Sequence, residues 1–117
     1  MSLCVGFIDN TRAVVIYYNM ARAELLLEDR YILSPRAFAE IVVWRLPKPL
    51  SGSAHRFKYR LAFVVDEKCV LRYDNKAGKG DHRHVKGRQT RYRFVDLDEL
   101  QADFWRYIDE WSPPWRP

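Results

Sequence analysis

Residues 57–73 read FKYRLAFVVDEKCVLRY and contain the clearest strand signal in the chain. Apolar side chains occupy every second position, the period of a β-strand with one face against a core: Phe57, Tyr59, Leu61, Phe63 and Val65. The intervening Lys58 and Arg60 predict an outer face that is partly basic. Residues 66–68 predict a short hairpin connection, and residues 69–73 a second strand.

Continued alternation places Leu71 and Tyr73 on one face of this second strand, and Arg72 and Asp74 on the other. Upstream of the hairpin, β-rich stretches predict further short strands at 23–27, 31–33 and 38–46. Downstream, glycine- and lysine-containing loops are expected at 75–80 and 86–90, a briefly extended piece at 82–85, and a last strand at 92–95.

A helix is expected to end the domain. Asp96 is a good N-cap, and Glu99 stands at the capping-box position three residues later. Apolar residues then recur at three- and four-residue spacing along one face: Leu97, Leu100, Phe104, Ile108 and Trp111. The predicted fold is therefore α+β, a single-domain antiparallel meander-like sheet with a C-terminal helix packed on one face.

The length and composition indicate one domain. The chain has 117 residues, 48% of them hydrophobic and 15% aromatic, too many for a disordered segment. Residues 20–117 are expected to form that domain. Residues 1–19 are interpreted as an N-terminal extension, either an added strand over 13–18 or a non-native start, so a chain beginning at Met20 is expected to fold.

No membrane span or signal peptide is evident, and the protein is expected to be cytoplasmic. Cys4 and Cys69 are far apart and lack the spacing of a zinc site or a disulfide framework, so both are expected to be thiols.

The positive charge is concentrated in the middle of the chain. Residues 55–94 carry twelve Lys and Arg against four Asp and Glu, a net of +8, together with all three histidines. Residues 95–117 carry a net of −4, and residues 1–54 a net of +1. This distribution predicts a surface facing a polyanion, either a nucleic acid or an acidic protein. A solvated basic face that binds nothing is the alternative.

The segment 73–84, YDNKAGKGDHRH, is the stretch that best resembles a site. In an extended backbone His82 and His84 project to the same side. His55 is expected to reach that face once the strand at 57–65 pairs with 69–75. Histidine pKa values lie near neutral pH, so these groups suit acid–base cleavage of a phosphodiester. The catalytic candidates are His82, His84, His55 and Asp74.

Two other interpretations of the histidines remain open. With Asp74 or Asp81 they could chelate a divalent metal, but the spacing is generic and the surrounding positive charge opposes a cation. They could also be loop residues bonded to backbone or water. The sequence predicts no metal and no other cofactor. The residues expected to contact nucleic acid are Arg72, Tyr73, Lys76, Lys79, Arg83 and Lys86, through phosphate charge or base stacking.

The chain resembles the TumE family of bacterial toxin–antitoxin proteins. The resemblance rests on FAEIVVWRLPKPLSGSAHRFKYRLAFV, VLRYDNKAGKGDHRH and YRFVDLDELQADFW, and runs from about Met20 to Trp111. Its most specific element is YDN followed by GKGDHRH. The resemblance implies growth inhibition and a cognate antitoxin, typically with a helix-turn-helix domain, that neutralises the toxin by direct contact. It implies no catalytic residues.

Three functional hypotheses follow. The first is a toxin that cleaves RNA without a metal ion, with histidines as acid and base; RNA as the substrate is an analogy with other small bacterial toxins. The second is a non-catalytic basic protein that sequesters nucleic acid or an acidic protein target. The third is a non-toxic nucleic-acid-binding module. The sequence leaves open whether the protein is a monomer or a homodimer.

Overall fold

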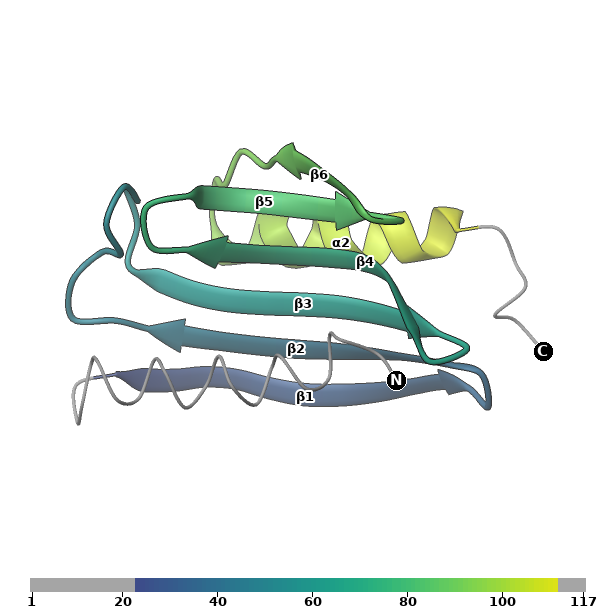
Figure 1. Cartoon of the computed structure of the whole chain (residues 1–117). Coiled ribbons are helices and arrows are strands. Elements are labelled where there is room, and N and C mark those ends of the chain that lie inside the picture. The colour runs from purple at the N-terminus through teal and green to yellow at the C-terminus, as the bar shows by residue number, and fades with distance from the viewer. Residues whose placement is uncertain (1–22, 112–117) are drawn as a thin grey trace.

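The protein is built on a six-stranded antiparallel sheet whose strands follow one another in chain order (Figure 1). A computed structural model describes residues 23–111. Its elements are β1 (Glu24–Ser34), β2 (Ala37–Arg45), β3 (Phe57–Val65), β4 (Lys68–Lys76), β5 (Gly80–Val85), β6 (Arg88–Arg91) and the helix α2 (Leu97–Glu110). The predicted α+β meander with a C-terminal helix is confirmed. The expected N-terminal extension, residues 1–19, lies outside the described part of the chain.

The main core lies between α2 and one face of the sheet. The alternate apolar residues of β3 and β4 are buried there, together with Leu100, Phe104 and Ile108 of the helix. The Asp96 side chain caps α2 by accepting a 2.7 Å hydrogen bond from the Glu99 backbone N–H. Both the strand alternation and the helix face therefore agree with the sequence pattern.

The opposite face of the sheet is also buried over its central strands. A second apolar cluster there contains Val42, Trp44, Leu46, Ala62 and Val64. Lys58 and Arg60 lie on this face as predicted, but they are only 8% and 2% exposed. The expected basic outer face of β3 is therefore a buried face that contains charges.

The two edge strands differ most from the prediction. β1 is one continuous strand, because the charged residues at 28–30 are tolerated at a solvated edge. At the other edge, Arg88–Arg91 forms β6 rather than part of a loop, and all four of its residues are exposed. Residues 92–95 are not a strand. Their backbone leaves the sheet after Tyr92 N–H donates to the Asp81 carbonyl at 3.0 Å.

Two further findings concern the chain as a whole. Cys69 is disulfide-bonded, so the expectation of a thiol is wrong for this residue; Cys4 lies outside the described residues. Within residues 23–111, no helix has the length and apolar character needed to span a bilayer.

Candidate functional site

The β4–β5 hairpin positions the two histidines of the GKGDHRH motif. β4 extends to Lys76, so the connection is the tight turn 77–79 rather than the predicted loop over 75–80. Gly78 occupies this turn with a positive φ of 78°, which favours glycine. The antiparallel register sets His82 opposite Asp74 and His84 opposite Arg72. The prediction that His82 and His84 share one face is confirmed.

Four charged or titratable side chains meet on that face and are called the Asp74 cluster: Arg60, Arg72, Asp74 and His84. Asp74 Oδ2 lies 3.3 Å from Arg60 Nη1 and 3.1 Å from Arg72 Nε, and Asp74 Oδ1 lies 3.5 Å from His84 Nε2. The Asp74 side chain is 3% exposed. It is therefore too buried to touch a substrate. Its carboxylate instead contacts the guanidinium groups of Arg60 and Arg72.

Burial and neighbouring charge disfavour the protonated form of His84. Its Nε2 lies 3.0 Å from Arg72 Nη2, which can donate only to an unprotonated nitrogen. Burial, followed by the positive charge of Arg72, lowers the pKa of His84 below the usual 6.5, while Asp74 opposes the shift. The imidazole of His84 is therefore neutral at physiological pH, the state that a general base requires.

His55 does not join this group, and the sequence expectation is wrong on this point. His55 Nε2 lies 2.8 Å from Asp81 Oδ2, and the imidazole stacks on Phe94 with ring centroids 3.9 Å apart. Asp81 alternates with His82 along β5 and lies on the helix side of the sheet. The Phe57 backbone N–H donates to His55 Nδ1 at 3.1 Å, so Nε2 is the protonated nitrogen and both ring nitrogens are in use.

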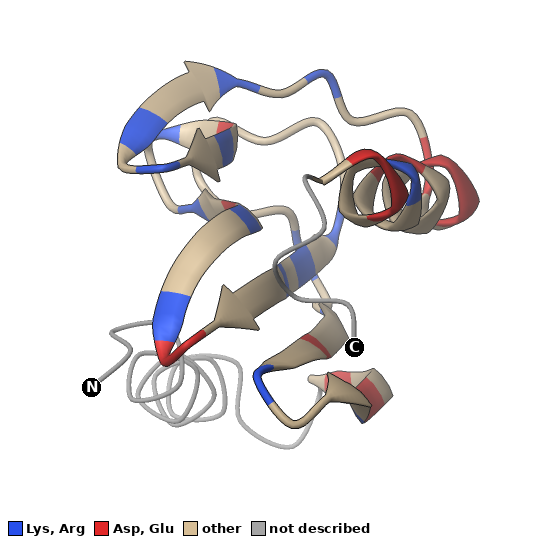
Figure 2. Cartoon of the chain, turned by 90° about the vertical axis from the view of Figure 1, so that its right-hand side faces the viewer, with Lys and Arg blue, Asp and Glu red and all other residues tan. Residues whose placement is uncertain are grey.

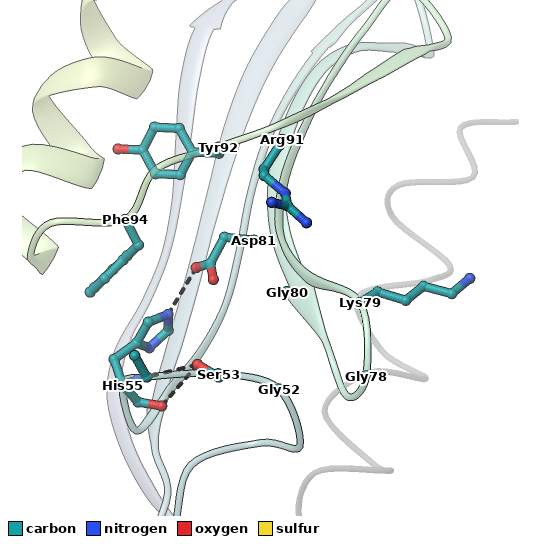
Figure 3. A pocket seen from close by; sticks show the side chains of 11 residues that line it. Gly52, Ser53, His55, Gly78, Lys79, Gly80, Asp81, Arg91, Tyr92 and Phe94 are labelled. Atoms are coloured by element: carbon teal, nitrogen blue, oxygen red, sulfur yellow. Dashed lines mark hydrogen bonds and ion pairs between the residues drawn. The ribbon is translucent and has the colours of Figure 1, made fainter.

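A cavity of about 390 Å³ opens beside this His55–Asp81 pair and is called the Asp81 pocket (Figure 3). Its walls come from the loop that precedes β3, the β4–β5 turn and the segment around the end of β6. The lining residues are Gly52, Ser53, Ala54, His55, Gly78, Lys79, Gly80, Asp81, Arg91, Tyr92 and Phe94. Two sequence-distant loops meet here, because Gly78 N–H donates to the Ser51 carbonyl at 2.7 Å.

Asn75 ties the hairpin to the strand that leads into the pocket. The β3–β4 backbone register ends at Arg60 and Asp74, and the Asn75 side chain continues the pairing. Its Oδ1 accepts from Tyr59 N–H at 3.0 Å and its Nδ2 donates to the Phe57 carbonyl at 2.7 Å. The amide therefore replaces the missing backbone pairs of a strand.

The residues predicted to contact RNA do not share one surface. Tyr73 is 1% exposed, with edge-on contacts to Tyr92 and Phe104, so its predicted stacking on a base is wrong. Arg83 lies on the helix side, with its guanidinium 5.5 Å from the Tyr107 ring centroid. Arg72 is held in the Asp74 cluster.

The three predicted lysines lie at or near the ends of the β5 hairpins. Lys76 is half-buried at the end of β4. Lys79 is exposed on the turn, and its side chain points away from His55 and Asp81 (Figure 3). Lys86 is exposed, with its ammonium 5.0 Å from the Trp111 ring centroid. Acidic residues gather along α2, but others lie on β1 and at the β3–β4 turn, so the basic residues are concentrated only over β4, β5, β6 and their turns (Figure 2).

The metal interpretation that includes Asp81 requires residues that the sheet separates, since Asp81 and the two histidines lie on opposite faces. Among residues 23–111, no three His, Cys, Asp or Glu side chains are grouped so that they could hold a metal ion.

Sequence reasoning missed the Asp81 pocket. Arg91 falls between the predicted loop at 86–90 and the predicted strand at 92–95, Tyr92 and Phe94 belong to that strand, and Asp81 is proposed only as a metal ligand. One signal could have identified the position of Asp81: the alternation that puts His82 and His84 on one face puts Asp81 on the other. The approach of the loop at 51–54 to the turn at 77–79 has no local signal.

Comparison with protein families identifies the chain. The family model described as Toxin TumE matches residues 7–112. The match begins before Met20, so the family includes most of the segment that the resemblance had left out. No curated protein and no solved structure matches the chain. Because the family model covers most of its length, the chain belongs to the TumE toxin family.

Proposed function

We propose that this toxin inhibits growth by cleaving RNA without a metal ion, with His82 and His84 as the proton-transfer pair. The observation that carries the proposal is their position side by side on β5, directly opposite Asp74 and Arg72. Acid–base cleavage needs two groups that exchange protons near neutral pH, with a cation beside them for the phosphate. Two imidazoles and the Arg72 guanidinium on adjacent strands support this proposal.

In this mechanism His84 is the base, because its neutral form is favoured. The phosphate of an entering RNA competes for the Arg72 guanidinium and releases His84 Nε2. His84 then takes the proton of a 2′-hydroxyl, whose oxygen attacks the adjacent phosphorus. His82 gives a proton to the leaving 5′-oxygen, and the products are a 2′,3′-cyclic phosphate and a 5′-hydroxyl. Asp74 is a positioning residue that holds Arg72.

A second function, sequestration without catalysis, is favoured by a different observation. His84 Nε2 already accepts from Arg72 Nη2, and Arg72 is paired with Asp74, so the cluster is internally paired without substrate. In that case the exposed bases of the hairpins would bind a polyanion, and growth inhibition would follow from occupancy alone. Only turnover separates the two functions, because both predict binding.

Membership of a toxin family implies a cognate antitoxin. We propose that this partner contains a helix-turn-helix domain and neutralises the toxin by direct contact. Co-expression of the two proteins should yield a stable complex, and the toxin alone should arrest growth.

The proposed function can be tested with three single variants expressed in bacteria: His82→Ala, His84→Ala and Gln89→Ala. Gln89 is the matched control, because it is exposed and pairs with His84 across β5 and β6. The histidine variants should lose toxicity, whereas Gln89→Ala should remain toxic. If both histidine variants are folded by circular dichroism and fully toxic, the chemistry lies elsewhere.

A further inference from the structure

The Asp81 pocket contains a hydrogen-bond acceptor, Asp81 Oδ1, that is held in place but accepts no hydrogen bond from the described residues. Asp81 Oδ2 accepts from the Tyr59 hydroxyl at 2.6 Å and pairs with His55 Nε2 at 2.8 Å. No described residue donates to Oδ1, although the Asp81 side chain is only 13% exposed. A carboxylate oxygen held this way accepts a hydrogen bond from a ligand that presents an O–H or N–H group.

The neighbours of Asp81 keep that oxygen fixed. Burial and the hydrogen bond to Asp81 strongly raise the pKa of Tyr59, so its hydroxyl remains a donor. The Phe57 N–H fixes the donor tautomer of His55, and the stacked Phe94 ring fixes the imidazole plane. The carboxylate is therefore set in one orientation before any ligand arrives, which lowers the entropy that binding must overcome.

The opening of the pocket suits a sugar–phosphate chain. Arg91 is an exposed residue in its lining, and guanidinium groups are suited to binding phosphate. Gly52, Gly78 and Gly80 line it without side chains, so a ligand backbone can approach closely. A volume of about 390 Å³ is within the range of small-ligand sites.

The ligand must therefore combine a hydrogen-bond donor with an anion a few bonds away. A ribonucleotide has this combination, because its 2′-hydroxyl is on the carbon next to the one that carries the 3′-phosphate. We infer that the Asp81 pocket binds one ribonucleotide of an RNA strand, with Asp81 Oδ1 accepting from the 2′-hydroxyl and Arg91 contacting the phosphate. This inference rests on the proposed function, since it takes RNA as the ligand.

The position of Arg91 links this pocket to the histidines. Arg91 is the cross-strand neighbour of His82 and also lines the pocket. One RNA strand can thus place a nucleotide in the pocket and pass around the hairpin to His82. The pocket then selects RNA over DNA, because only the ribose supplies the 2′-hydroxyl.

The test measures binding of a fluorescent RNA oligonucleotide and a DNA oligonucleotide of the same base sequence by anisotropy. The background is the His82→Ala/His84→Ala double variant, which prevents cleavage during the measurement. We expect RNA to bind about tenfold more tightly than DNA. Asp81→Asn should abolish this preference by weakening RNA alone. The amide oxygen will accept from His55 and Tyr59, which leaves an NH₂ donor in place of Oδ1.

Two further variants control for charge. Asp98→Asn removes one carboxylate from the exposed side of α2 and should leave both affinities unchanged. Arg91→Ala should weaken RNA and DNA alike, because both present phosphates. Melting temperatures of all variants check that each is folded.

The outcomes separate this inference from the proposed function. Equal binding of RNA and DNA, or an equal loss of both in folded Asp81→Asn, overturns the pocket assignment even if the wild-type protein cleaves RNA. A preference for RNA that depends on Asp81 supports it even if the wild-type protein cleaves nothing. Absence of binding to either strand at low salt overturns both proposals.

Discussion

Two aspartates on neighbouring strands have opposite surroundings. Asp74 is buried among cations on one face of the sheet, whereas Asp81 retains an accessible oxygen on the other. Sequence alternation was sufficient to place Asp74 and the two histidines, because they lie on paired strands. It could not place His55, because the conformation of the loop at 47–56 decides where that imidazole points. The burial of Tyr73 likewise depends on α2, which is distant in sequence.

The first prediction concerns the burial of Asp74. Asp74→Asn removes the negative charge that faces Arg60 and Arg72 and leaves the buried guanidinium of Arg60 and the half-buried guanidinium of Arg72 without it. Breaking a buried ion pair from one side typically costs about 3–5 kcal/mol, and we expect a loss of that size in the free energy of unfolding. Urea denaturation measures it, with Asp98→Asn as the exposed control. A loss below about 1 kcal/mol would show that the cluster contributes little to stability.

A second prediction follows from the lowered pKa of His84. The unfolded chain takes up a proton at the usual imidazole value, whereas the folded protein does so only at lower pH. His84 therefore makes the fold less stable as the pH falls below about 6.5 and has no effect above it. The loss of unfolding free energy between about pH 7.5 and about pH 5.5 should be smaller in His84→Gln than in the wild type. An unchanged loss would mean that folding does not shift the His84 pKa.

At the scale of elements, the sequence predicted those strands and helices whose limits follow from apolar periodicity and from a helix cap. β2, β3 and α2 are close to their expected limits, because each has a buried face that imposes its period. The edge strands were less predictable: β1 contains charged residues in its middle and β6 has no buried face, so neither shows a complete strand pattern. β4 was predicted too short, because the Asp74 and Asn75 side chains resemble those of a turn.

The third prediction tests the role of Asn75 between β3 and β4. Asn75→Ala leaves Tyr59 N–H and the Phe57 carbonyl without their side-chain partners. Each unsatisfied buried group costs about 1–3 kcal/mol, so we expect the two groups together to cost about 2–6 kcal/mol. Hydrogen exchange gives a local readout, because the Tyr59 amide should exchange faster than it does in the wild type. A Tyr59 amide that remains as protected in folded Asn75→Ala would contradict this role.

At the scale of the whole molecule, basic residues are concentrated over β4, β5, β6 and their turns, whereas acidic residues lie along α2, on β1 and at the β3–β4 turn (Figure 2). The exposed bases Lys79, Lys86, Arg88, Arg91 and Arg93 come from the β5–β6 edge of the sheet, its turns and the chain that follows it. Composition predicted this concentration of charge. It could not show that Lys58, Arg60 and Arg72 make hydrogen bonds or ion pairs within the protein, because their burial depends on the packing of both faces of the sheet.

A fourth prediction concerns how strongly the RNA affinity of these exposed bases depends on salt. If about four of them neutralise phosphates, the logarithm of the RNA affinity should fall with the logarithm of the salt concentration with a slope near −3, since each contact contributes about −0.7. Anisotropy titrations over a range of salt concentrations measure this slope. Binding that is independent of salt would instead favour an acidic protein target.

The central claim is that this toxin turns over RNA with His82 and His84. Its most direct test is to incubate the purified protein with a large excess of RNA in EDTA and to count cleavage events per protein molecule. We predict many turnovers for the wild type and for Gln89→Ala, and a loss of about 10²-fold or more in rate for His82→Ala and for His84→Ala. No turnover by the wild type, or undiminished turnover by both folded histidine variants, would contradict it.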